Sequence, residues 1–376
     1  MLPQPPIWLV LIAFICALGP LVFFHELGHY FVARLFKIPA EVFSIGFGKE
    51  IFGWTDKQGT RWKVAWLPLG GYVKFVGDMS PASNPSDLQD LPPEVREKAF
   101  QTRPVWQRFL VVLAGPAANF LIAIAIFTAF FAVVGMPRTE NLVVNVQPGS
   151  VAQKIGIQRG DRIVAISGDD TPTFEDISNI VLMRPGEPVT LSVLRNKQVV
   201  NLPVIIGAAE EKDRFGQKFR VGRLGIYGDT RTYVKLSPLE LVPAATTYTI
   251  KLTGSMMQGL WQIVSGRRSA SELGGPIKIA QVAGQSASLG VLAFVQLLAL
   301  FSINLGFINL LPVPMLDGGH LFFYAIEAVR RRPVSARALD WAFRGGLALI
   351  LALMVFTTIN DLGSIGLWDR LQRLIG

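Results

Sequence analysis

The amino-acid sequence predicts an α-helical membrane protein with about four transmembrane helices, a membrane-associated β-hairpin and an inserted α+β domain. Three observations predict this class. Hydrophobic residues make up 51% of the 376 residues and charged residues only 17%, which lies outside the range of an ordinary soluble enzyme. Four long stretches carry no charge. Between the second and the third, short strand-like runs alternate with turn residues.

The first predicted span is the uncharged stretch at residues 7–24. As a helix that rises about 1.5 Å per residue, it nearly crosses a hydrocarbon core of roughly 30 Å. A cleaved signal peptide is the alternative, but the residues before this stretch include no Lys or Arg, so the usual positive region is missing. Residues 1–36 are therefore expected to hold the first transmembrane helix.

Three further stretches are long enough to span a bilayer: residues 109–136, 289–315 and 345–360. Small residues in the first of these allow close approach of another helix. Residues 239–264 are partly apolar but are interrupted by Lys251, which favours an amphipathic or peripheral helix.

The predicted organisation follows from these stretches. It comprises a first helix (1–36), a loop with a hairpin (37–104), a second helix (105–136), a soluble domain (137–207), a linker with the peripheral segment (208–285), a third helix (286–328), and a basic loop with the fourth helix (329–376).

Basic residues close to the ends of the predicted spans set the expected orientation. They bracket the loop after the first span and fill the loop before the fourth: Arg34, Lys37, Arg103 and Arg108, then Arg330, Arg331, Arg332, Arg337 and Arg344. Because such residues concentrate in cytoplasmic loops, both loops are expected on the cytoplasmic side. The soluble domain then lies on the extracytoplasmic side.

The soluble domain is expected to be small and mixed. A helix fits between residues 174 and 183, and the β-type runs are residues 142–146, 162–166, 189–194 and 199–204. The sequence of residues 146–152, followed by that of residues 156–163, resembles a bacterial PDZ domain. One such unit is expected, since no second copy occurs at a fixed period.

A histidine pair at the end of the first uncharged stretch is the main chemical signal. The sequence His25-Glu26-Leu27-Gly28-His29 places two imidazoles on one face of a helix, where they can share a metal ion. Glu26 then lies beside the metal as a candidate general base. The alternative is a pair of buried core histidines, but an ionisable group at the end of an apolar span is costly and usually functional.

Two histidines leave a catalytic zinc site one ligand short, because such sites usually have three protein ligands and one open position. Asp317 is the only acidic residue between Glu272 and Glu327, and it follows the third apolar stretch. It is therefore the candidate third ligand. The alternative is an aspartate that caps the helix beginning near Gly318, and this role is compatible with metal binding.

Taken together, these motifs resemble the site-2 protease family of intramembrane zinc proteases, specifically the bacterial regulator-of-sigma-E protease type. The resemblance covers nearly the whole chain: H-E-x-x-H at residues 25–29, G-P-x-x-N from Gly115 to Asn119, one PDZ unit, and N-x-x-P-x-P-x-L-D-G from Asn309 to Gly318. The chain departs from the pattern in the PDZ region, where some relatives have two such domains.

The resemblance implies roles for individual residues. It implies Zn²⁺ bound by His25, His29 and Asp317, Glu26 as the catalytic base, and Asn304 and Asn309 as residues that hold the substrate backbone. Asn119 belongs to the second motif. His320 is expected either beside the metal ligands or simply as a polar residue of its helix.

The resemblance also implies a substrate and a place in the cell. The substrate that the family resemblance implies is a single-span membrane protein, specifically an anti-sigma factor. It is expected to be cut in its transmembrane segment after a first cut by another protease. The expected location is the bacterial inner membrane. Two alternatives remain at this point: a catalytically inactive PDZ scaffold, and a membrane-anchored metalloprotease that acts on water-exposed substrates.

Family proteins carry a hydrophobic β-hairpin after the first span, and residues 42–48 and 61–75 fit it. An extended substrate segment can add as a strand to an edge of this hairpin within residues 64–75. The alternative is a hairpin that only anchors the protein at the membrane interface, through Phe52, Trp54, Trp62 and Trp66.

Composition excludes two other classes of site. The net charge is +9, but the basic residues are scattered around apolar segments, which favours a membrane surface over nucleic acid as the partner. Cys16 is the only cysteine, so an intrachain disulfide and a zinc site built from several cysteines are both excluded.

Overall fold

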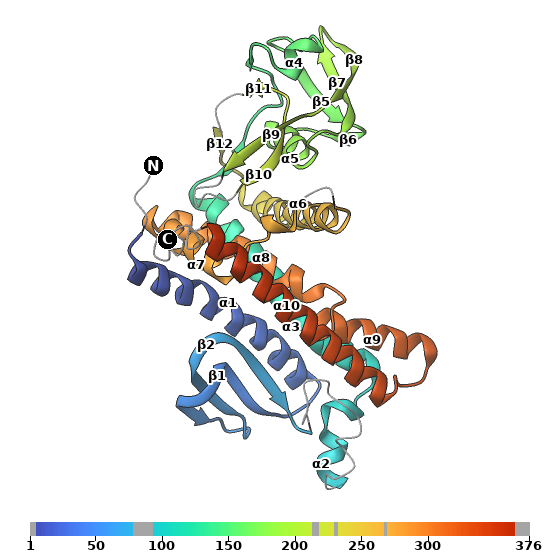
Figure 1. The fold of residues 1–376 in the computed structure, drawn as a ribbon. Coiled ribbons are helices and arrows are strands. Elements are labelled where there is room, and N and C mark those ends of the chain that lie inside the picture. The colour runs from blue at the N-terminus through green and yellow to red at the C-terminus, as the bar shows by residue number, and fades with distance from the viewer. Residues whose placement is uncertain (1–4, 78–92, 213–217, 229–231, 267–268, 365–376) are drawn as a thin grey trace, which may run out of the picture. The chain divides into compact units, whose positions relative to one another are not determined.

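The computed structural model describes residues 5–77, 93–212, 218–228, 232–266 and 269–364 (Figure 1). The chain divides into two compact units. The first comprises Met1–Phe127 with Gly274–Asp361, and the second Thr128–Leu273 with Leu362–Gly376.

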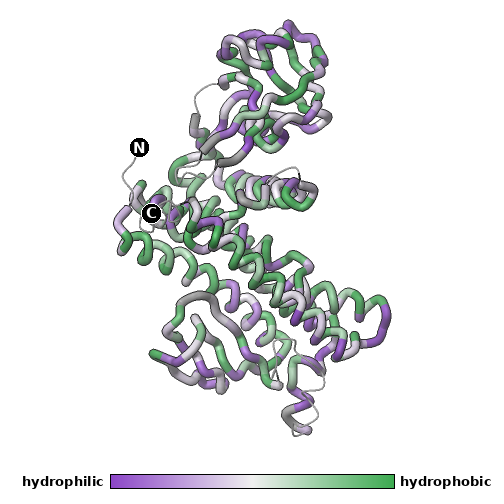
Figure 2. The backbone as a smooth tube through the Cα atoms, in the orientation of Figure 1, coloured by the Kyte–Doolittle hydropathy of each residue, from purple (hydrophilic) through white to green (hydrophobic). Residues whose placement is uncertain are grey.

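The first unit is mainly helical. Its helices, in chain order, are α1 (Ile7–Leu35), α2 (Pro93–Lys98), α3 (Val105–Val133), α7 (Pro276–Ser288), α8 (Val291–Leu310), α9 (Asp317–Arg330) and α10 (Ala336–Ser364), with a 3-10 turn at Phe100–Thr102. Within the described residues, four helices are long and apolar enough to cross a membrane: α1, α3, α8 and α10. Hydrophobic residues dominate these helices in Figure 2.

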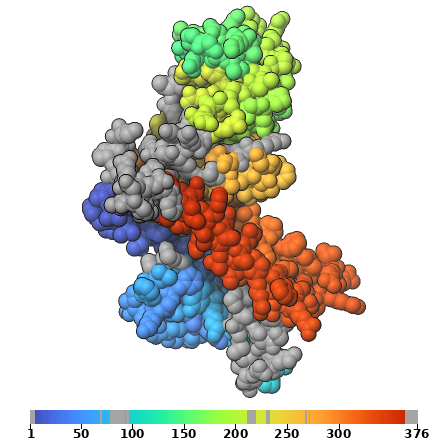
Figure 3. All heavy atoms as spheres, in the orientation of Figure 1, coloured from blue at the N-terminus to red at the C-terminus, as the bar shows by residue number. Residues whose placement is uncertain are grey.

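The four predicted spans are confirmed as helices, but their bounds change. Helix α1 continues to Leu35, so the histidine motif lies inside it. The third predicted span was wrong at its end: α8 stops at Leu310, because Pro312 and Pro314 cannot continue a helix. Helix α10 is longer than predicted, and Figure 3 shows its side chains at the surface, where many apolar groups are exposed.

Helix α7 was not predicted, and it joins α1 to α8. Ala283 of α7 is buried together with Ala13 and Ala17 of α1 and with Leu297 of α8. A Cβ on Gly284 would lie 2.6 Å from Val10 Cγ2, so the two backbones approach closely there. Asp361 holds the start of α7, since its carboxylate accepts hydrogen bonds from the backbone N–H groups of Gly275 and Lys278, at 3.0 and 2.9 Å.

The predicted hairpin is present as β1 (Ala40–Thr55) and β2 (Arg61–Phe75), and it is longer than expected. Residues 42–45 of β1 pair on one edge with residues 71–74 of β2 and on the other edge with residues 61–64. The chain must therefore bend inside each strand. Gly46, Gly48 and Gly70 allow these bends, with φ values of +87°, +90° and +119°.

Asp56 organises the turn between β1 and β2. Its carboxylate accepts hydrogen bonds from the backbone N–H groups of Gln58 and Thr60, from Trp62 Nε1 at 3.0 Å and from the Tyr30 hydroxyl at 3.1 Å. Burial alone would raise the pKa of Asp56, but these hydrogen bonds outweigh it and hold the pKa below its usual value. The turn is thereby tied to helix α1.

The second unit contains the predicted small α+β domain. Strands β6 (Asp169–Asp170), β5 (Arg162–Ile166), β7 (Pro188–Arg195) and β8 (Gln198–Ile205) form one sheet in that order. Helices α4 (Val151–Lys154) and α5 (Phe174–Met183) accompany it. The predicted runs at residues 162–166, 189–194 and 199–204 and the helix at residues 174–183 are confirmed as elements. Of residues 142–146, only β4 (Asn145–Val146) forms a regular strand.

Short strands that the sequence did not predict complete the unit. The segment expected to be a linker contains β9 (Gly207–Lys212), β10 (Lys218–Arg223), β11 (Ile226–Tyr227) and β12 (Thr232–Val234). Strand β11 pairs with β4, and β12 pairs with β3 (Met136–Arg138). Helix α6 (Pro238–Val264) follows. It is not among the four span-forming helices of the described residues.

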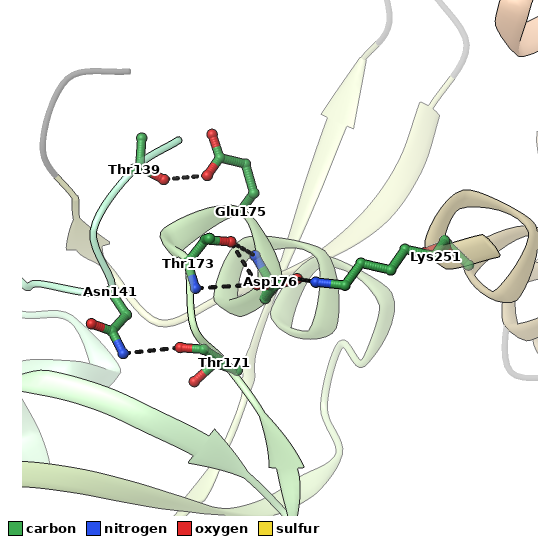
Figure 4. A network of polar contacts seen from close by, with 8 residues as sticks. Thr139, Asn141, Thr171, Thr173, Glu175, Asp176 and Lys251 are labelled. Atoms are coloured by element: carbon green, nitrogen blue, oxygen red, sulfur yellow. Dashed lines mark hydrogen bonds and ion pairs between the residues drawn. The ribbon is translucent and has the colours of Figure 1, made fainter. Parts of the chain in front are cut away.

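A polar network fixes α5 and connects it to α6 (Figure 4). Thr173 and Asp176 form a capping box at the start of α5, in which each side chain satisfies a backbone N–H group of the first turn. The second oxygen of Asp176 accepts from Lys251 Nζ of α6 at 2.9 Å. The lysine that interrupts the apolar pattern of α6 therefore has a structural partner.

Asp161 anchors the loop before β5. It is 2% exposed, and its carboxylate accepts from Arg195 Nε at 2.8 Å, from Arg195 Nη2 at 2.7 Å and from the backbone N–H of Gln158 at 2.8 Å. Burial would raise the pKa of Asp161, but the hydrogen bonds from Arg195 and Gln158 hold it below its usual value.

Candidate metal centre

Helix α1 carries both histidines of the motif on one buried face. His25 and His29 are each 7% exposed, and their ring centroids lie 4.8 Å apart. The Nε2 atoms face each other at 3.3 Å. If each ring is protonated at Nδ1, both Nε2 atoms present lone pairs, and a shared cation would bind them.

Close contact between α1 and α3 depends on two glycines. A Cβ on Gly28, inside the histidine motif, would lie 2.3 Å from the backbone oxygen of Ala114. A Cβ on Gly115 would lie 2.2 Å from His29 Nε2. Any side chain at Gly115 would therefore occupy the space in front of the His29 imidazole. This explains why the second motif has glycine at this position.

The turn between α8 and α9 brings Asp317 to the histidines. Asp317 is the first residue of α9, and the turn before it includes Met315 with φ +82°. Gly318 and Gly319 pack so closely against the turn that a Cβ on either would come within 2.5 Å of a backbone oxygen. Asp317 Oδ2 lies 3.1 Å from His25 Nε2 and 3.5 Å from His29 Nε2.

The three converging atoms fit a tetrahedral zinc ion. Their separations are 3.1, 3.3 and 3.5 Å, and ligand atoms that surround zinc at about 2.0–2.1 Å lie about 3.3 Å apart. Asp317 Oδ2 is buried and has no hydrogen-bond partner within the described part of the chain. An orphan carboxylate oxygen between two imidazole nitrogens is costly unless a cation completes the group.

The outer nitrogens of the two imidazoles are also held. His29 Nδ1 donates to the backbone oxygen of Val111 at 2.9 Å, which leaves Nε2 free to bind a metal. The side-chain nitrogen Nδ2 of Asn119 lies 3.0 Å from His25 Nδ1, and its Oδ1 is buried without a hydrogen-bond partner among the described residues. The reversed amide orientation would satisfy Oδ1, because Oδ1 would then accept from His25 Nδ1–H and hold the metal-binding tautomer.

Asn119 is itself fixed within the helix packing. It is fully buried, and its backbone oxygen accepts from Ser302 Oγ of α8 at 2.7 Å. Gly306 of α8 lies beside it, since a Cβ there would be 3.3 Å from Asn119 Cβ. Helix α8 thus holds the residue that orients His25.

A cavity of about 700 Å³ opens in front of the three ligand atoms. Glu26, Asn309 and His320 line it together with the ligands, whereas Asn304 is not among its lining residues. The His320 ring packs against Phe343, with centroids 4.8 Å apart. The predicted site residues other than Asn304 and Asn119 therefore share one cavity.

Strand β2 forms a wall of this cavity, which the sequence indicated only as a possible substrate edge. Residues 70–75 line it. A Cβ on Gly71 would lie 3.1 Å from Glu26 Cγ, and the backbone amide of Val73 interacts with the Glu26 carboxyl group. The edge of β2 that does not pair with β1 therefore borders the candidate base.

One partly buried ion pair near the site was not predicted. Arg108 Nη2 of α3 donates to Glu327 Oε1 of α9 at 2.7 Å, and the Arg108 guanidinium lies over the Tyr324 ring. In the sequence, Arg108 is only one of the basic residues that flank a predicted loop. Glu327 is only the next acidic residue after Asp317. Their pairing depends on long-range packing that no local pattern encodes.

Comparisons with known proteins agree with this chemistry. The sequence model of Peptidase family M50 matches residues 13–353. A protein of Agrobacterium fabrum, named as a candidate zinc metalloprotease, is 44% identical over 361 residues, which cover 94% of this chain and 96% of that protein. One from Brucella suis with the same kind of name is 42% identical over 359 residues and covers 94% of each chain.

A more distant relative and a solved structure complete the comparison. Metalloprotease MmpA of Caulobacter vibrioides is 35% identical over 379 residues, covering 94% of this chain and 95% of the relative. The PDZ domain of an SdrC-like protein from Listeria monocytogenes matches 25% of this chain and 93% of its own, with 17% identity and a TM-score of 0.20.

Proposed function

The chain belongs to peptidase family M50 and is a zinc metalloprotease, and from this premise we propose that it hydrolyses peptide bonds in the transmembrane segments of single-span membrane proteins. The observation that carries the proposal is the convergence of His25 Nε2, His29 Nε2 and Asp317 Oδ2 beside Glu26. These groups lie on helices that are apolar enough to be membrane-embedded, or directly next to one.

His25, His29 and Asp317 are proposed to hold the zinc ion. When bound in a site with an open position, zinc polarises a carbonyl group and makes water acidic enough to react near neutral pH. His29 keeps its metal-facing nitrogen unprotonated through its hydrogen bond to Val111. Asn119, with its amide oxygen toward the ring, is proposed to do the same for His25.

Glu26 is proposed as the general base and then the general acid. Its carboxylate takes a proton from the attacking water and passes it to the nitrogen of the leaving amine. Asn309 lines the same cavity, where its amide N–H can donate to the oxygen of the scissile carbonyl as negative charge develops there. Asn304 is proposed to act on the substrate backbone from outside this lining, as in the family it resembles.

A membrane helix hides its carbonyl groups in its own hydrogen bonds, so a substrate must unwind locally before it can be cut. We propose that the unwound segment pairs with the open edge of β2 at residues 71–75. That edge lines the cavity, and the backbone amide of Val73 in it interacts with the Glu26 carboxyl group. Main-chain pairing would satisfy the freed backbone groups and present a carbonyl to the metal site.

The hairpin also fits the interfacial anchor that was the alternative. Phe52, Trp54 and Trp66 are 63%, 49% and 64% exposed, as expected for aromatic residues at a membrane interface. Trp62, the fourth residue of that alternative, instead stacks on Phe43 and Trp54 within the hairpin. The two roles are compatible, because the exposed aromatic residues and the cavity-lining edge are different parts of the hairpin.

The location and partners are proposed from the family resemblance and the basic residues. The protein is proposed to lie in the bacterial inner membrane, with its PDZ-like domain extracytoplasmic and residues 330–344 cytoplasmic. Its substrate is proposed to be an anti-sigma factor already cut once by another protease. Reporter fusions after Gly207 and after Arg332 should give opposite signals, and equal signals would contradict this orientation.

Expression beside a panel of single-span membrane proteins tests the activity. Wild type should produce truncated fragments, and Glu26→Gln should not, because the isosteric amide cannot accept a proton. A loss of about a hundredfold or more is expected. The Gln variant should keep its zinc, which distinguishes a lost base from a lost fold. Cleavage at more than about a tenth of the wild-type rate would remove Glu26 from this role.

The same experiment separates the two alternatives. An inactive scaffold would leave the whole panel intact with both proteins. A protease of water-exposed substrates would cut outside the membrane segments, and mapping the fragment ends by mass spectrometry would show this.

A further inference from the structure

A second cavity in the first unit, of about 680 Å³, lies at the end of α1. The last turns of α1, the hairpin turn and the segment before α3 enclose it. Its cationic lining residues are Arg34, Lys37, Lys98 and Arg103, and no acidic residue of the described ranges lines it. We refer to it as the basic pocket.

Two arginines of the basic pocket have buried nitrogen atoms without hydrogen-bond partners. Arg34 Nη2 and Arg103 Nε are inaccessible to solvent and unpaired within the described parts of the chain. Leaving a donor of a charged group buried and unpaired is costly, more so than for a neutral group. The unpaired donors and the cationic lining together favour an anionic ligand in the basic pocket.

The other contacts of these arginines hold them in place without satisfying those nitrogens. Arg103 Nη2 donates to the backbone oxygen of Lys37 at 3.3 Å. The Arg34 guanidinium lies over the Tyr30 ring, 5.5 Å from its centroid, which leaves the N–H groups in the guanidinium plane available. A positive charge interacts favourably with the C-terminal end of a helix, which explains why Arg34 lies in the last turn of α1. That interaction does not give the buried Nη2 atom a hydrogen-bond partner.

Apolar side chains next to the basic pocket indicate a lipid as the source of the anion. Phe31 lines the pocket and is 61% exposed, and Leu35 and Trp106 nearby are 64% and 56% exposed. All three lie on α1 or α3, two helices long and apolar enough to cross a membrane. The Trp106 ring packs edge-on against Phe36, with centroids 5.2 Å apart, and tryptophan is typical of the membrane–water interface.

We propose that the basic pocket binds the phosphate headgroup of an anionic phospholipid, whose acyl chains lie along Phe31, Leu35 and Trp106. Arginine suits this ligand because its planar guanidinium group donates two parallel hydrogen bonds to phosphate oxygens. Basic pockets beside transmembrane helices are a recurring way to bind such headgroups. The site is independent of the proposed catalytic residues, none of which lines it.

Lipid titration of the full-length protein tests the proposal. The purified protein, stripped of lipid in a neutral detergent, is titrated with short-chain phosphatidylglycerol, short-chain phosphatidylcholine or inorganic phosphate, and binding is followed by native mass spectrometry. Phosphatidylglycerol should bind at least about tenfold more tightly than phosphatidylcholine. Inorganic phosphate should not displace it over the same concentration range.

A matched pair of double variants locates the site. Arg34→Gln with Arg103→Gln should weaken phosphatidylglycerol binding by about tenfold or more. Arg331→Gln with Arg332→Gln removes the same charge from an exposed loop and should change binding by less than about twofold. Retained zinc and an unchanged melting temperature in detergent show that the variants are folded.

Two single variants keep the test decisive if the double variant does not fold. Lys98→Gln changes an exposed lining residue and should still weaken binding measurably. Arg34→Lys keeps the charge but loses the planar pair of donors, so it should also weaken binding. Equal losses in the pocket and control variants, equal binding of phosphatidylcholine, or full competition by inorganic phosphate would each overturn the proposal.

Discussion

Asn119, which is proposed to orient His25, was harder to identify from the sequence than the metal ligands themselves. His25 and His29 are recognisable from their spacing alone, and Asp317 stands out as the single acidic residue of its segment. Asn119 has no such signal outside the family motif. Only the fold shows that its amide lies 3.0 Å from His25 Nδ1 and that its Oδ1 is otherwise unpaired among the described residues.

Replacing Asn119 by leucine should therefore weaken zinc binding. The side chain keeps a similar volume but cannot accept from His25 Nδ1–H, and loss of such a partner typically lowers metal affinity by about 10–100-fold. Zinc retention against a series of chelator concentrations measures the change.

Asn309→Leu is the control, because Asn309 lines the cavity but is proposed to contact the substrate. It should lower cleavage while keeping zinc affinity near wild type. An Asn119→Leu protein that holds zinc as tightly as wild type would show that Asn119 does not orient the ligand.

At the scale of helices and strands, the long apolar elements were predictable and the small-residue contacts were not. The spans α1, α3, α8 and α10 are visible as uncharged runs. Helix α7 was missed because its contact surface consists of small residues such as Ala283 and Gly284, which give no apolar periodicity. Strands β11 and β12 were missed because they are short and pair with distant segments, whereas β9 and β10 pair with each other.

The approach of α1 to α3 should be sensitive to a single methyl group. Gly28→Ala places a Cβ 2.3 Å from a backbone oxygen of α3, and overpacking of this kind typically costs about 1–3 kcal/mol. The melting temperature in detergent and the zinc content should both fall.

Gly19→Ala in the same helix is the matched control, since a Cβ there meets no atom of the described residues within 4 Å. Its effect should remain within about 0.5 kcal/mol. Equal melting temperatures for the two variants would show that the glycine in the histidine motif is not needed for helix contact.

The ion pair of Asp161 with Arg195 should make the stability of the second unit depend on pH. The pKa of Asp161 is below its usual value in the folded state, and the unfolded value is about 3.9. The carboxylate therefore stabilises the fold above about pH 4, and this contribution is lost as the pH falls through the folded pKa. Amide hydrogen exchange in β5 and β7 of the full-length chain reports it.

Asp161→Asn should remove about 1–3 kcal/mol at neutral pH and flatten the acid dependence. Asp169→Asn is the control, because the Asp169 carboxylate is 57% exposed in its ion pair with Arg184 and such pairs contribute about 1 kcal/mol or less. Identical exchange profiles for the two variants would contradict the account.

At the scale of the whole molecule, the site is assembled from segments that are far apart in the chain. Residue types and spacing were enough to name its candidate ligands, since the chain has only three histidines and one isolated aspartate in the relevant segment. The wall formed by β2, the pair of Arg108 with Glu327 and the basic pocket were not predictable. Each depends on which helices pack together, and no local pattern determines that.

Zinc X-ray absorption spectroscopy of the purified full-length protein tests the central claim most directly. We expect zinc coordinated by two imidazole nitrogens and by oxygen, all at about 2.0–2.1 Å, with no sulfur. In His29→Ala the imidazole signal should fall or the zinc should be lost. A wild-type spectrum without two imidazoles, or one with sulfur from Cys16, would contradict the site formed by His25, His29 and Asp317.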